Sequence, residues 1–312
     1  MADSLLGLSD LLVINDQNLA DLEVSDLLDD APLLAALAAE TASNGTLHSY
    51  VKETAAPVVG FRAANTGRDL SHSTDTAVTI TLKILDASFQ IDKALADAYM
   101  KGGPAGLIAR ELKRHLKAAF AAAELQIVNG VGADAGGFVG LTGASTIDAL
   151  ADGMVYNATG ATALSSVYLI RTTPEGNDVT LIAGNDGQLN VGETVEQLVK
   201  DGDGKSYPAY TTSVLGWLGL QIGSAQSVGR IANVGAAAGK TLTDAMLGEA
   251  LSLFPSSRQP NLIVMNRRSR KQLQLSRTAT NATGAPAPRP TEYEGIPILT
   301  SEAVLNTETA VA

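Results

Sequence analysis

One segment, residues 104–129, constrains the fold of this chain more than any other. Its sequence, PAGLIARELKRHLKAAFAAAELQIVN, places Ile108, Leu112, Leu116 and Phe120 at the spacing of one helix face. The leading proline suits the first turn of a helix, where its missing N–H has no partner to lose. At 1.5 Å per residue the helix would be about 39 Å long, well above the usual length in globular proteins. The sequence therefore predicts one unusually long helix.

Five glycines follow this helix within residues 129–141, NGVGADAGGFVGL. Gly130-x-Gly132-x-x-Ala135 matches the spacing of a loop that binds the pyrophosphate of a dinucleotide. That loop requires a strand before it and a helix after it, whereas here the helix comes first. Gly130 is better interpreted as the residue that ends the helix, because glycine adopts a left-handed conformation at low cost.

The charges divide the chain into an acidic N-terminal segment and a nearly balanced remainder. Residues 1–51 hold nine of the 33 acids and no Lys or Arg, which leaves 24 acids against 22 bases elsewhere. Such a segment is unsuited to binding DNA phosphates. It is either a solvated, partly helical tail or a strap whose apolar residues dock on a neighbouring molecule. The residues that would dock are Leu5, Leu11, Val13, Leu27, Leu33 and Leu37.

Residues 46–85 are typical of a long two-stranded arm. The segment TLHSYVKET alternates its residues between two faces, and AVTITLKIL does the same with β-branched residues. A loop with Gly60, Gly67 and several turn formers lies between them. Because a lone two-stranded ribbon is at best marginally stable in water, the arm must lie against the body of this chain or against another copy.

The remainder of the chain is rich in strands and turns. Residues 165–189 are predicted to form a hairpin with its turn at 174–177. A helix is expected over 241–254, with Thr241 or Thr243 as its N-cap. The other predicted elements are short strands over 207–234, a buried strand at 261–266, a basic helix at 267–277 and a final strand at 294–304.

Motifs of enzyme or metal sites find no support in the sequence. The chain has no cysteine, and His48, His72 and His115 show no ligand or triad spacing. Residues 201–207, DGDGKSY, share features with a P-loop and with a calcium loop, but they lack the first glycine of one and the third ligand of the other. We therefore expect no catalytic, cofactor-binding or metal-binding residues, and no stretch is apolar enough to cross a membrane. An enzyme whose active-site residues come from distant segments stays an alternative.

Three motifs, in a characteristic order, resemble the major capsid proteins of tailed bacteriophages, which have the Hong Kong 97 fold. The first is the helix end followed by Asn129-Gly130-x-Gly132 and later Gly140-Leu141. The second is LIVMNRRSRKQLQLSR, a strand that ends in Met-Asn before a helix, and the third is YEGIPILTSEAV. The resemblance spans most of the chain and implies an α+β protein with a Hong Kong 97-like capsid fold.

The resemblance also implies a division of the chain and a function. The expected function is that of a non-enzymatic major capsid protein without cofactors, located in the virion capsid and assembled in the host cytoplasm. It would form hexamers and pentamers of an icosahedral head that encloses double-stranded DNA without binding it specifically. Its expected partners are itself and separate scaffolding, portal and decoration proteins, with no membrane. The expected parts are an N-terminal arm (1–45), an E-loop (46–85), a P-domain with the long spine helix (86–150), an A-domain with a β-rich insertion (151–284) and a return to the P-domain (285–312).

Subunit contacts are expected from the two projecting segments. In the E-loop these are Arg62, Asn65 and Arg68, and we expect the arginines to pair with carboxylates of a neighbour. Some members of the family join subunits through an E-loop lysine, but arginine cannot form that amide, so covalent joining is not expected. In the N-terminal arm the expected contacts are Leu11, Leu27 and Leu33. Since the chain passes from its first residue directly into this arm, we expect any scaffold to be a separate protein.

An encapsulin-type compartment is the main alternative within the same fold. Such a shell would enclose cargo enzymes rather than a genome, and the sequence alone does not separate the two. A β-rich fibre protein is disfavoured by the long helix.

Overall fold

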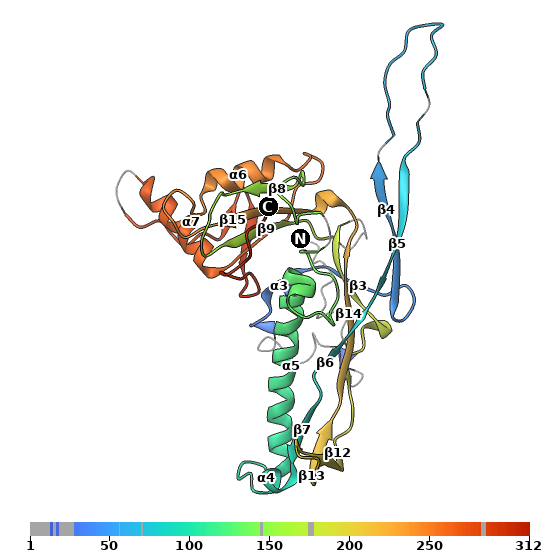
Figure 1. Cartoon of the computed structure of the whole chain (residues 1–312), viewed down its shortest axis with the longest axis vertical. Helices are drawn as coiled ribbons and strands as arrows, with labels where there is room; N and C mark the ends of the chain where they lie inside the picture. Colours follow the sequence, from blue (N-terminus) through green and yellow to red (C-terminus); the bar gives the residue numbers. More distant parts are fainter. Residues whose placement is uncertain are drawn as a thin grey trace.

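The computed structural model describes residues 13–14, 17–18, 28–55, 57–69, 71–143, 146–173, 178–281 and 285–312. The molecule is elongated, with helix α5 (Gly103–Asn129) along its long axis and strands beside that helix. A second sheet with two helices lies to one side, and a hairpin projects beyond the body (Figure 1). No helix in the described part of the chain is both long and apolar enough to cross a membrane.

Helix α5 is the long helix that the sequence predicts, and it begins one residue earlier than expected. The preceding helix α4 (Lys93–Asp97) is capped by Asp92, whose carboxylate accepts from the backbone N–H of Ala94 at 2.7 Å. Gly102 and Gly103 both have positive φ, 85° and 62°, so the chain turns between the two helices in a conformation that favours glycine. The buried residues of α5 lie in its second half. They are Leu116, Ala119, Phe120, Ala123, Glu124, Gln126, Ile127 and Val128.

The glycine run after α5 folds the chain back onto the end of that helix. Gly130 follows the last helical residue with a φ of 52°, which confirms its predicted role as the C-cap. The returning segment hydrogen-bonds to the last turn, because the Leu141 N–H donates to the Ile127 carbonyl at 2.7 Å. Gly140 lies directly on the helix end, where a Cβ atom would come within 2.4 Å of the Gln126 carbonyl oxygen. The glycines therefore permit a close backbone crossing at a helix C-terminus.

Two sheets extend along α5. Their strands are β3 (Ala39–Thr41), β6 (Lys83–Asp86), β7 (Phe89–Asp92), β10 (Val179–Ala183), β11 (Asn190–Val191), β12 (Val195–Lys200), β13 (Ser206–Thr212) and β14 (Val214–Ile222). One sheet has the order β11-β14-β10-β3, with β6 also paired to β14, and the other has the order β12-β13-β7. β10 and β3 are parallel, whereas the other pairs are antiparallel. Together with α4 and α5 they form the long part of the body.

A six-stranded sheet forms the other part of the body. Its strands are β8 (Val155–Asn157), β9 (Ser165–Ile170), β15 (Val228–Val234), β16 (Leu262–Met265), β17 (Glu292–Tyr293) and β18 (Ile296–Thr300), in the order β17-β18-β16-β9-β15-β8. β9, β15 and β16 are buried along their whole length, as expected for strands that are covered on both faces. This sheet carries the two remaining long helices.

The caps of these two helices explain where they begin. Helix α6 (Asp244–Ser252) starts after Thr243, whose hydroxyl accepts from the Met246 N–H at 3.4 Å, so Thr243 rather than Thr241 is the N-cap. Helix α7 (Arg267–Ala279) starts after Asn266, whose side-chain oxygen accepts from the Ser269 N–H at 2.8 Å. The Met-Asn pair in the second sequence motif is thus the junction of a buried strand with a capped helix. The remaining short elements are β1 (Val13–Ile14), β2 (Gln17–Asn18) and 3-10 turns at Gly130–Gly132, Asn185–Gly187 and Ala225–Ser227.

One prediction about the middle of the chain is wrong. Residues 165–189 form no hairpin, because β9 joins the six-stranded sheet and β10 joins a sheet beside α5. The predicted turn at 174–177 lies outside the described residues. Near the end of the chain, β18 joins the six-stranded sheet by pairing in parallel with β16. Residues 207–234 supply β14 to one sheet and β15 to another, and the expected division of the chain into an arm, an E-loop, a P-domain and an A-domain stays a prediction.

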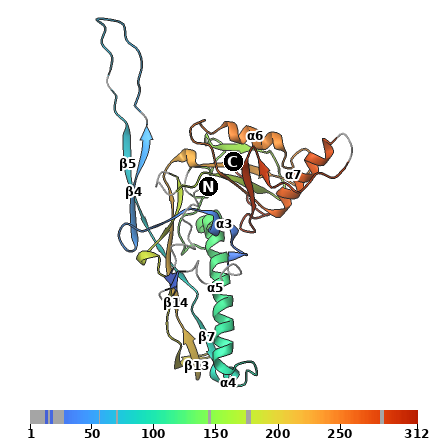
Figure 2. The same ribbon diagram turned by 180° about the vertical axis from the view of Figure 1, so that it is seen from behind.

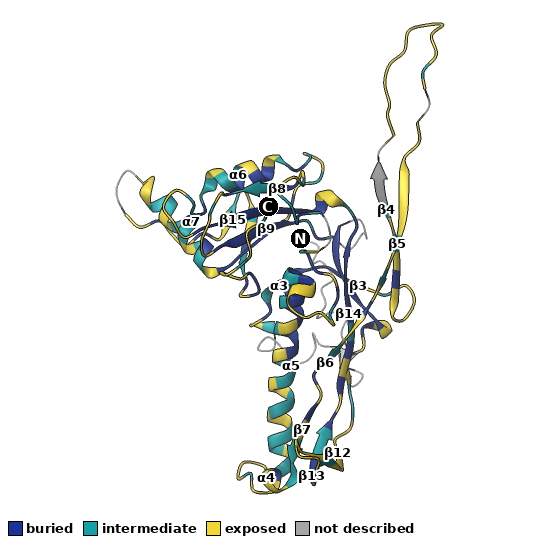
Figure 3. Cartoon of the chain, viewed as in Figure 1, coloured by how far each residue is buried: buried dark blue, intermediate teal, exposed yellow. Residues whose placement is uncertain are grey.

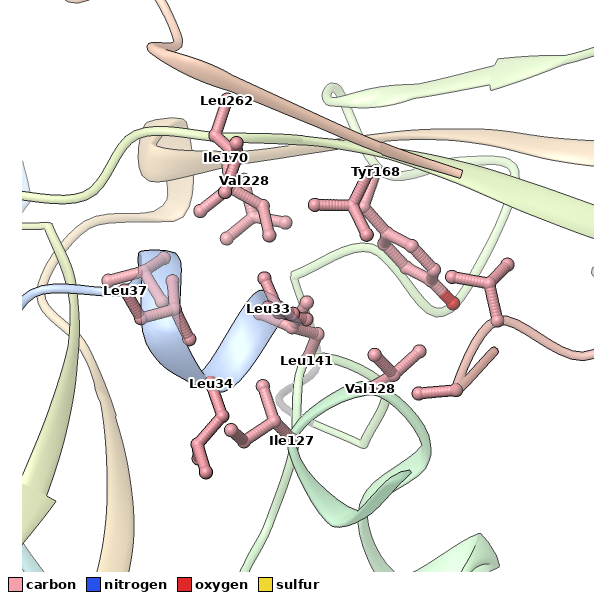
Figure 4. Packing of buried hydrophobic residues seen from close by; sticks show 14 of the residues in the cluster. Leu33, Leu34, Leu37, Ile127, Val128, Leu141, Tyr168, Ile170, Val228 and Leu262 are labelled. Atoms are coloured by element: carbon pink, nitrogen blue, oxygen red, sulfur yellow. The ribbon is translucent and has the colours of Figure 1, made fainter. Parts of the chain in front are cut away.

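Helix α3 (Pro32–Ala36) closes the core between the end of α5 and the six-stranded sheet. Figure 4 shows Leu33, Leu34 and Leu37 between Ile127 of α5 and Ile170 of the sheet. Each of the three leucines is at most 1% exposed. Because the burial of one leucine contributes about 1.5–3 kcal/mol, these residues are a fixed part of the core of their own subunit.

Replacing Gly140 by alanine should destabilise the protein. The new Cβ atom would lie 2.4 Å from the Gln126 carbonyl oxygen and 2.6 Å from the Gly130 nitrogen, and backbone atoms cannot move aside. We expect the free energy of unfolding to fall by about 1–3 kcal/mol, as for other overpacked sites. Urea unfolding at matched protein concentration would measure it. Gly132→Ala is the control, because no atom lies within 4 Å of its new Cβ; equal losses in the two variants would contradict the crossing described above.

Candidate assembly surfaces

The arm is formed by β4 (Leu47–Ala55) and β5 (Thr74–Thr81), which pair antiparallel from Leu47↔Thr81 to Ala55↔Thr74. Its loop is described at residues 57–69 and 71–73. Seen from both sides, this hairpin extends well beyond the sheets and helices (Figures 1 and 2). The predicted two-stranded arm is therefore present, although the last residues assigned to it form β6 of the body.

The base of the arm is fixed to the body of its own chain. His48 is 5% exposed, and its Nε2 lies 2.6 Å from Oε1 of Gln221 on β14. The Tyr50 hydroxyl donates to the Ile222 carbonyl at 3.4 Å, and burial raises the pKa of this tyrosine, which keeps the donor protonated. Leu82, which directly follows β5, is 1% exposed. The face of β4 that carries His48 and Tyr50 is thus the face that packs.

The loop at the end of the arm is exposed along most of its length (Figure 3), and it carries apolar side chains that its own chain leaves uncovered. Val58, Val59 and Phe61 are 71%, 84% and 107% exposed. Single exposed apolar residues are common, but a cluster on a projecting segment marks a surface for another molecule. Our sequence interpretation missed these residues. The signal was the apolar pair and aromatic of PVVGF inside an otherwise polar loop.

The three E-loop residues predicted at a subunit contact all lie in this loop. Arg62 donates to the Thr66 carbonyl at 3.2 Å, and Arg68 donates to the Val58 carbonyl at 2.9 Å. Asn65 has a φ of 62°, the left-handed conformation in which asparagine is tolerated at a turn. Both arginines therefore brace the loop itself, and their pairing with a neighbour stays a proposal.

The N-terminal predictions have a different outcome. Leu11 and Leu27 lie outside the described residues. Leu33 was expected to dock on a neighbouring subunit, and the structure corrects this expectation. Its side chain is fully buried in its own chain, between α5 and the six-stranded sheet (Figure 4), because α3 packs there as part of the core.

A buried carboxylate joins α3, α5 and the end of β18. Glu124 is 1% exposed, and its Oε2 accepts from the backbone N–H groups of Leu33 at 2.7 Å and Leu34 at 3.0 Å. The Ser301 hydroxyl donates to its other oxygen. Burial raises the pKa of Glu124, although the three hydrogen bonds oppose that rise. A single side chain thus ties the N-terminal segment and the six-stranded sheet to the long helix.

A second buried carboxylate fixes the crossover between the two parts of the body. Asp178 stands just before β10 and accepts from Arg171 Nε at 2.9 Å and from an Arg258 guanidinium nitrogen at 2.6 Å. The Thr173 and Ser227 hydroxyls donate to it at 2.8 Å each. Burial acts to raise the pKa of Asp178, but these four hydrogen bonds outweigh it and hold the pKa below its usual value.

The described residues contain no cluster of side chains typical of a metal centre. No group of three or more His, Asp or Glu side chains among them could hold a metal ion. His115 stacks on Phe89 at 4.8 Å, far along the chain from His48 at the base of the arm. The cavity of about 660 Å³ beside the C-terminal residues contains Arg230 and Glu308, which bond to each other at 2.9 Å.

The family of this chain follows from comparison with known proteins. The model of a family described as major capsid protein GP7 matches residues 16–312. This chain belongs to that family. It is therefore a structural protein of the virion capsid and not an enzyme, as the sequence motifs implied.

Solved structures agree with this assignment at the level of the fold. A chain in a cryo-EM structure of bacteriophage Epsilon15 is 19% identical, with a TM-score of 0.61, and the match covers 87% of each chain. The bacteriophage JBD30 capsid is 11% identical, with a TM-score of 0.49, over 86% of this chain and 89% of that one. The SrpI encapsulin of Synechococcus elongatus PCC 7942 is 8% identical, with a TM-score of 0.45, over 66% and 88%. The predicted Hong Kong 97-like fold is confirmed. No curated protein sequence matches the chain.

Replacing Glu124 by alanine should weaken the whole junction. The substitution leaves the buried N–H groups of Leu33 and Leu34 without an acceptor, and each unsatisfied donor costs about 1–3 kcal/mol. Urea unfolding followed by circular dichroism would measure the loss. Glu111→Ala on the same helix is the control, since its exposed pair with Arg114 should contribute less than about 0.5 kcal/mol. A loss no larger than that of the control would contradict the role given to Glu124.

Asp178 should make the free energy of unfolding depend on pH in the acidic range. Its pKa is lower in the folded state, so its stabilising contribution is present above its unfolded pKa of about 3.9 and is lost as the pH falls through the folded value. Asp178→Asn should therefore lower stability by about 1.5–3 kcal/mol at neutral pH and flatten the fall in stability below about pH 4. Urea unfolding across this range would show it. Asp203→Asn, which changes an 82% exposed side chain, is the control and should change stability at neutral pH by less than about 0.5 kcal/mol.

Proposed function

We propose that this chain builds the shell of a phage head, in which copies form hexamers and pentamers of an icosahedral capsid around double-stranded DNA. The observation that carries the proposal is the arm, whose base is fixed to the body and whose tip is uncovered by its own chain. A two-stranded ribbon gains little stability alone. The arm therefore gains stability when it lies across a neighbouring copy, so that assembly stabilises the arm.

The family match supports a phage head rather than a cell compartment that encloses cargo. It covers nearly the whole chain and describes a major capsid protein. The encapsulin shares the general fold over a smaller part of this chain. We keep the compartment as an alternative that differs in the enclosed material and not in the construction of the wall.

The charge of the chain fits a wall that encloses DNA without gripping it. The protein has 33 acids against 22 bases, and strong binding to DNA phosphates requires clusters of Lys and Arg. On α5 Arg114 pairs with Glu111 at 2.8 Å, and on α7 Arg277 pairs with Asp244 at 2.7 Å, so these two cations bond within the chain. A container that holds DNA weakly allows the DNA to be packed and released.

Contacts between copies are proposed to be non-covalent. Lysines of the arm region lie on strands, Lys52 on β4 and Lys83 on β6, and the tip carries Arg62 and Arg68 instead. Their remaining guanidinium N–H groups are suited to carboxylates of a neighbour. Separate scaffolding, portal and decoration proteins are proposed as further partners. One structure of the JBD30 capsid is decorated with minor capsid protein trimers, which is an observation on that capsid.

Removing the outer arm should abolish shell assembly while the body stays folded. Residues 53–75 can be replaced by an Asn-Gly turn that joins the paired residues Lys52 and Thr76. We expect an unaltered circular dichroism spectrum of the body and small particles in place of shells, measured by sedimentation velocity and negative-stain microscopy. Leu275→Ser removes a 57% exposed apolar side chain from α7 and is the control, which should still form shells. Shells of normal yield from the shortened protein would overturn the proposal.

A further inference from the structure

The uncovered tip of the arm needs a receptor of matching chemistry. Val58, Val59 and Phe61 lie within four positions and are all more than 70% exposed. In both views the tip lies at the far end of the molecule from α5 and β6 (Figures 1 and 2). The arm therefore cannot cover its tip with that part of its own body, and a second copy is the available source of a receptor.

A groove on the body has the right chemistry for this tip. Its lining includes Ile84 and Leu85 of β6, Ala122 and Ala123 of α5, and Phe138 of the glycine-rich return. The volume of this groove is about 220 Å³. An apolar cavity of about 150 Å³ is enough to hold benzene, so the groove can accept the ring of a phenylalanine. Ile84 is 56% exposed, which leaves the apolar wall open to a partner.

The charges beside the tip and the groove are complementary. Arg62 directly follows Phe61, and its exposed guanidinium makes one described hydrogen bond, to the Thr66 carbonyl. A guanidinium has five N–H donors, so others stay available to a partner. Asp134 is an exposed residue that lines the groove. With Phe61 in the groove, the adjacent arginine can reach this carboxylate at the rim.

Two other hollows on the body fit the tip less well. The cavity of about 660 Å³ is bordered by the paired charges of Arg230 and Glu308. A hollow beside β7 and β13 is lined mainly by Ser, Thr and Gln side chains. An apolar tip with an adjacent cation matches an apolar groove with an acidic rim better than it matches either of these.

We propose that the arm tip of one copy inserts Phe61, with Val58 and Val59, into the groove between β6 and α5 of the next copy, where Arg62 meets Asp134. This inference rests on the proposed function, because it names the surface that receives the arm during assembly. Each copy then gives an arm on one side and offers a groove on the other. Such a head-to-tail contact repeats around a ring, which is how closed capsomers form.

Engineered disulfides can test this contact, because the chain has no cysteine. Ala63, beside the docking residues, and Ala122, on the groove wall, are both exposed and can be changed to cysteine with little loss of packing. A disulfide forms where the two Cα atoms approach within about 7 Å. Assembled Ala63→Cys/Ala122→Cys protein should give a ladder of covalent oligomers in non-reducing electrophoresis, and the ladder should disappear on reduction.

Two kinds of control variant distinguish a disulfide at this contact from random oxidation between exposed thiols. Each single cysteine variant should stay monomeric in the same gel. Ala63→Cys/Leu198→Cys places the second thiol on β12, at another exposed apolar surface, where Leu198 is 73% exposed, and should give no ladder. Shells that form without a ladder from the Ala63–Ala122 pair, or with a ladder from the Leu198 pair, would overturn the docking site and leave the proposed function standing. Failure of the unsubstituted protein to form shells would overturn the proposed function and this inference with it.

Discussion

The rest of the structure depends on how the second half of α5 is joined to its neighbours. The Glu124 carboxylate lies inside the core and binds two backbone N–H groups of α3 and the hydroxyl of Ser301. One turn further on, the glycine-rich segment crosses the helix end so closely that Gly140 has no room for a side chain. A buried charge is costly unless its hydrogen bonds are complete, so this junction has one favourable arrangement and fixes the angle between the helix and the six-stranded sheet.

A rigid body of this kind explains why one segment can remain outside it. The core is continuous from α3 through α5 to the sheet that contains β10 and β14 and to the six-stranded sheet, so the body is stabilised without the arm. The arm is attached at a well-packed base, where His48 and Leu82 are buried, and then leaves the body. Its direction is therefore set by the core, while its tip remains free for a second molecule. Because the base of the arm is fixed and its tip is free, the fold of one subunit determines the direction in which it can contact the next.

Local signals in the sequence predicted the elements that depend on local physics. The long helix, the C-cap at Gly130 and the pairing of the arm all follow from periodicity and turn chemistry. The sheet partners of β9 and β10 could not be predicted in this way. Turn residues indicate that the chain changes direction, but they do not indicate which strand it pairs with afterwards. Glu124 offered a signal that was missed: it is a carboxylate among Phe120, Ala123 and Ile127, on the face predicted to be buried. Its partners lie about 90 and 177 positions away, and no local pattern identifies them.

The arginines of the arm show how a predicted contact residue can act before any contact is made. Arg68 and Ser71 both donate to the Val58 carbonyl, and the Val58 N–H donates back to Ser71, so the backbone at the start of the apolar cluster is held from several sides. Gly60 leaves room for this brace, since a Cβ atom there would lie 2.9 Å from the Arg68 guanidinium and would displace the end of that side chain. A loop that is ordered before it binds loses less conformational entropy on binding. The arginines therefore contribute to assembly by fixing the conformation of the loop. Phe61 then has its binding position before the next copy arrives.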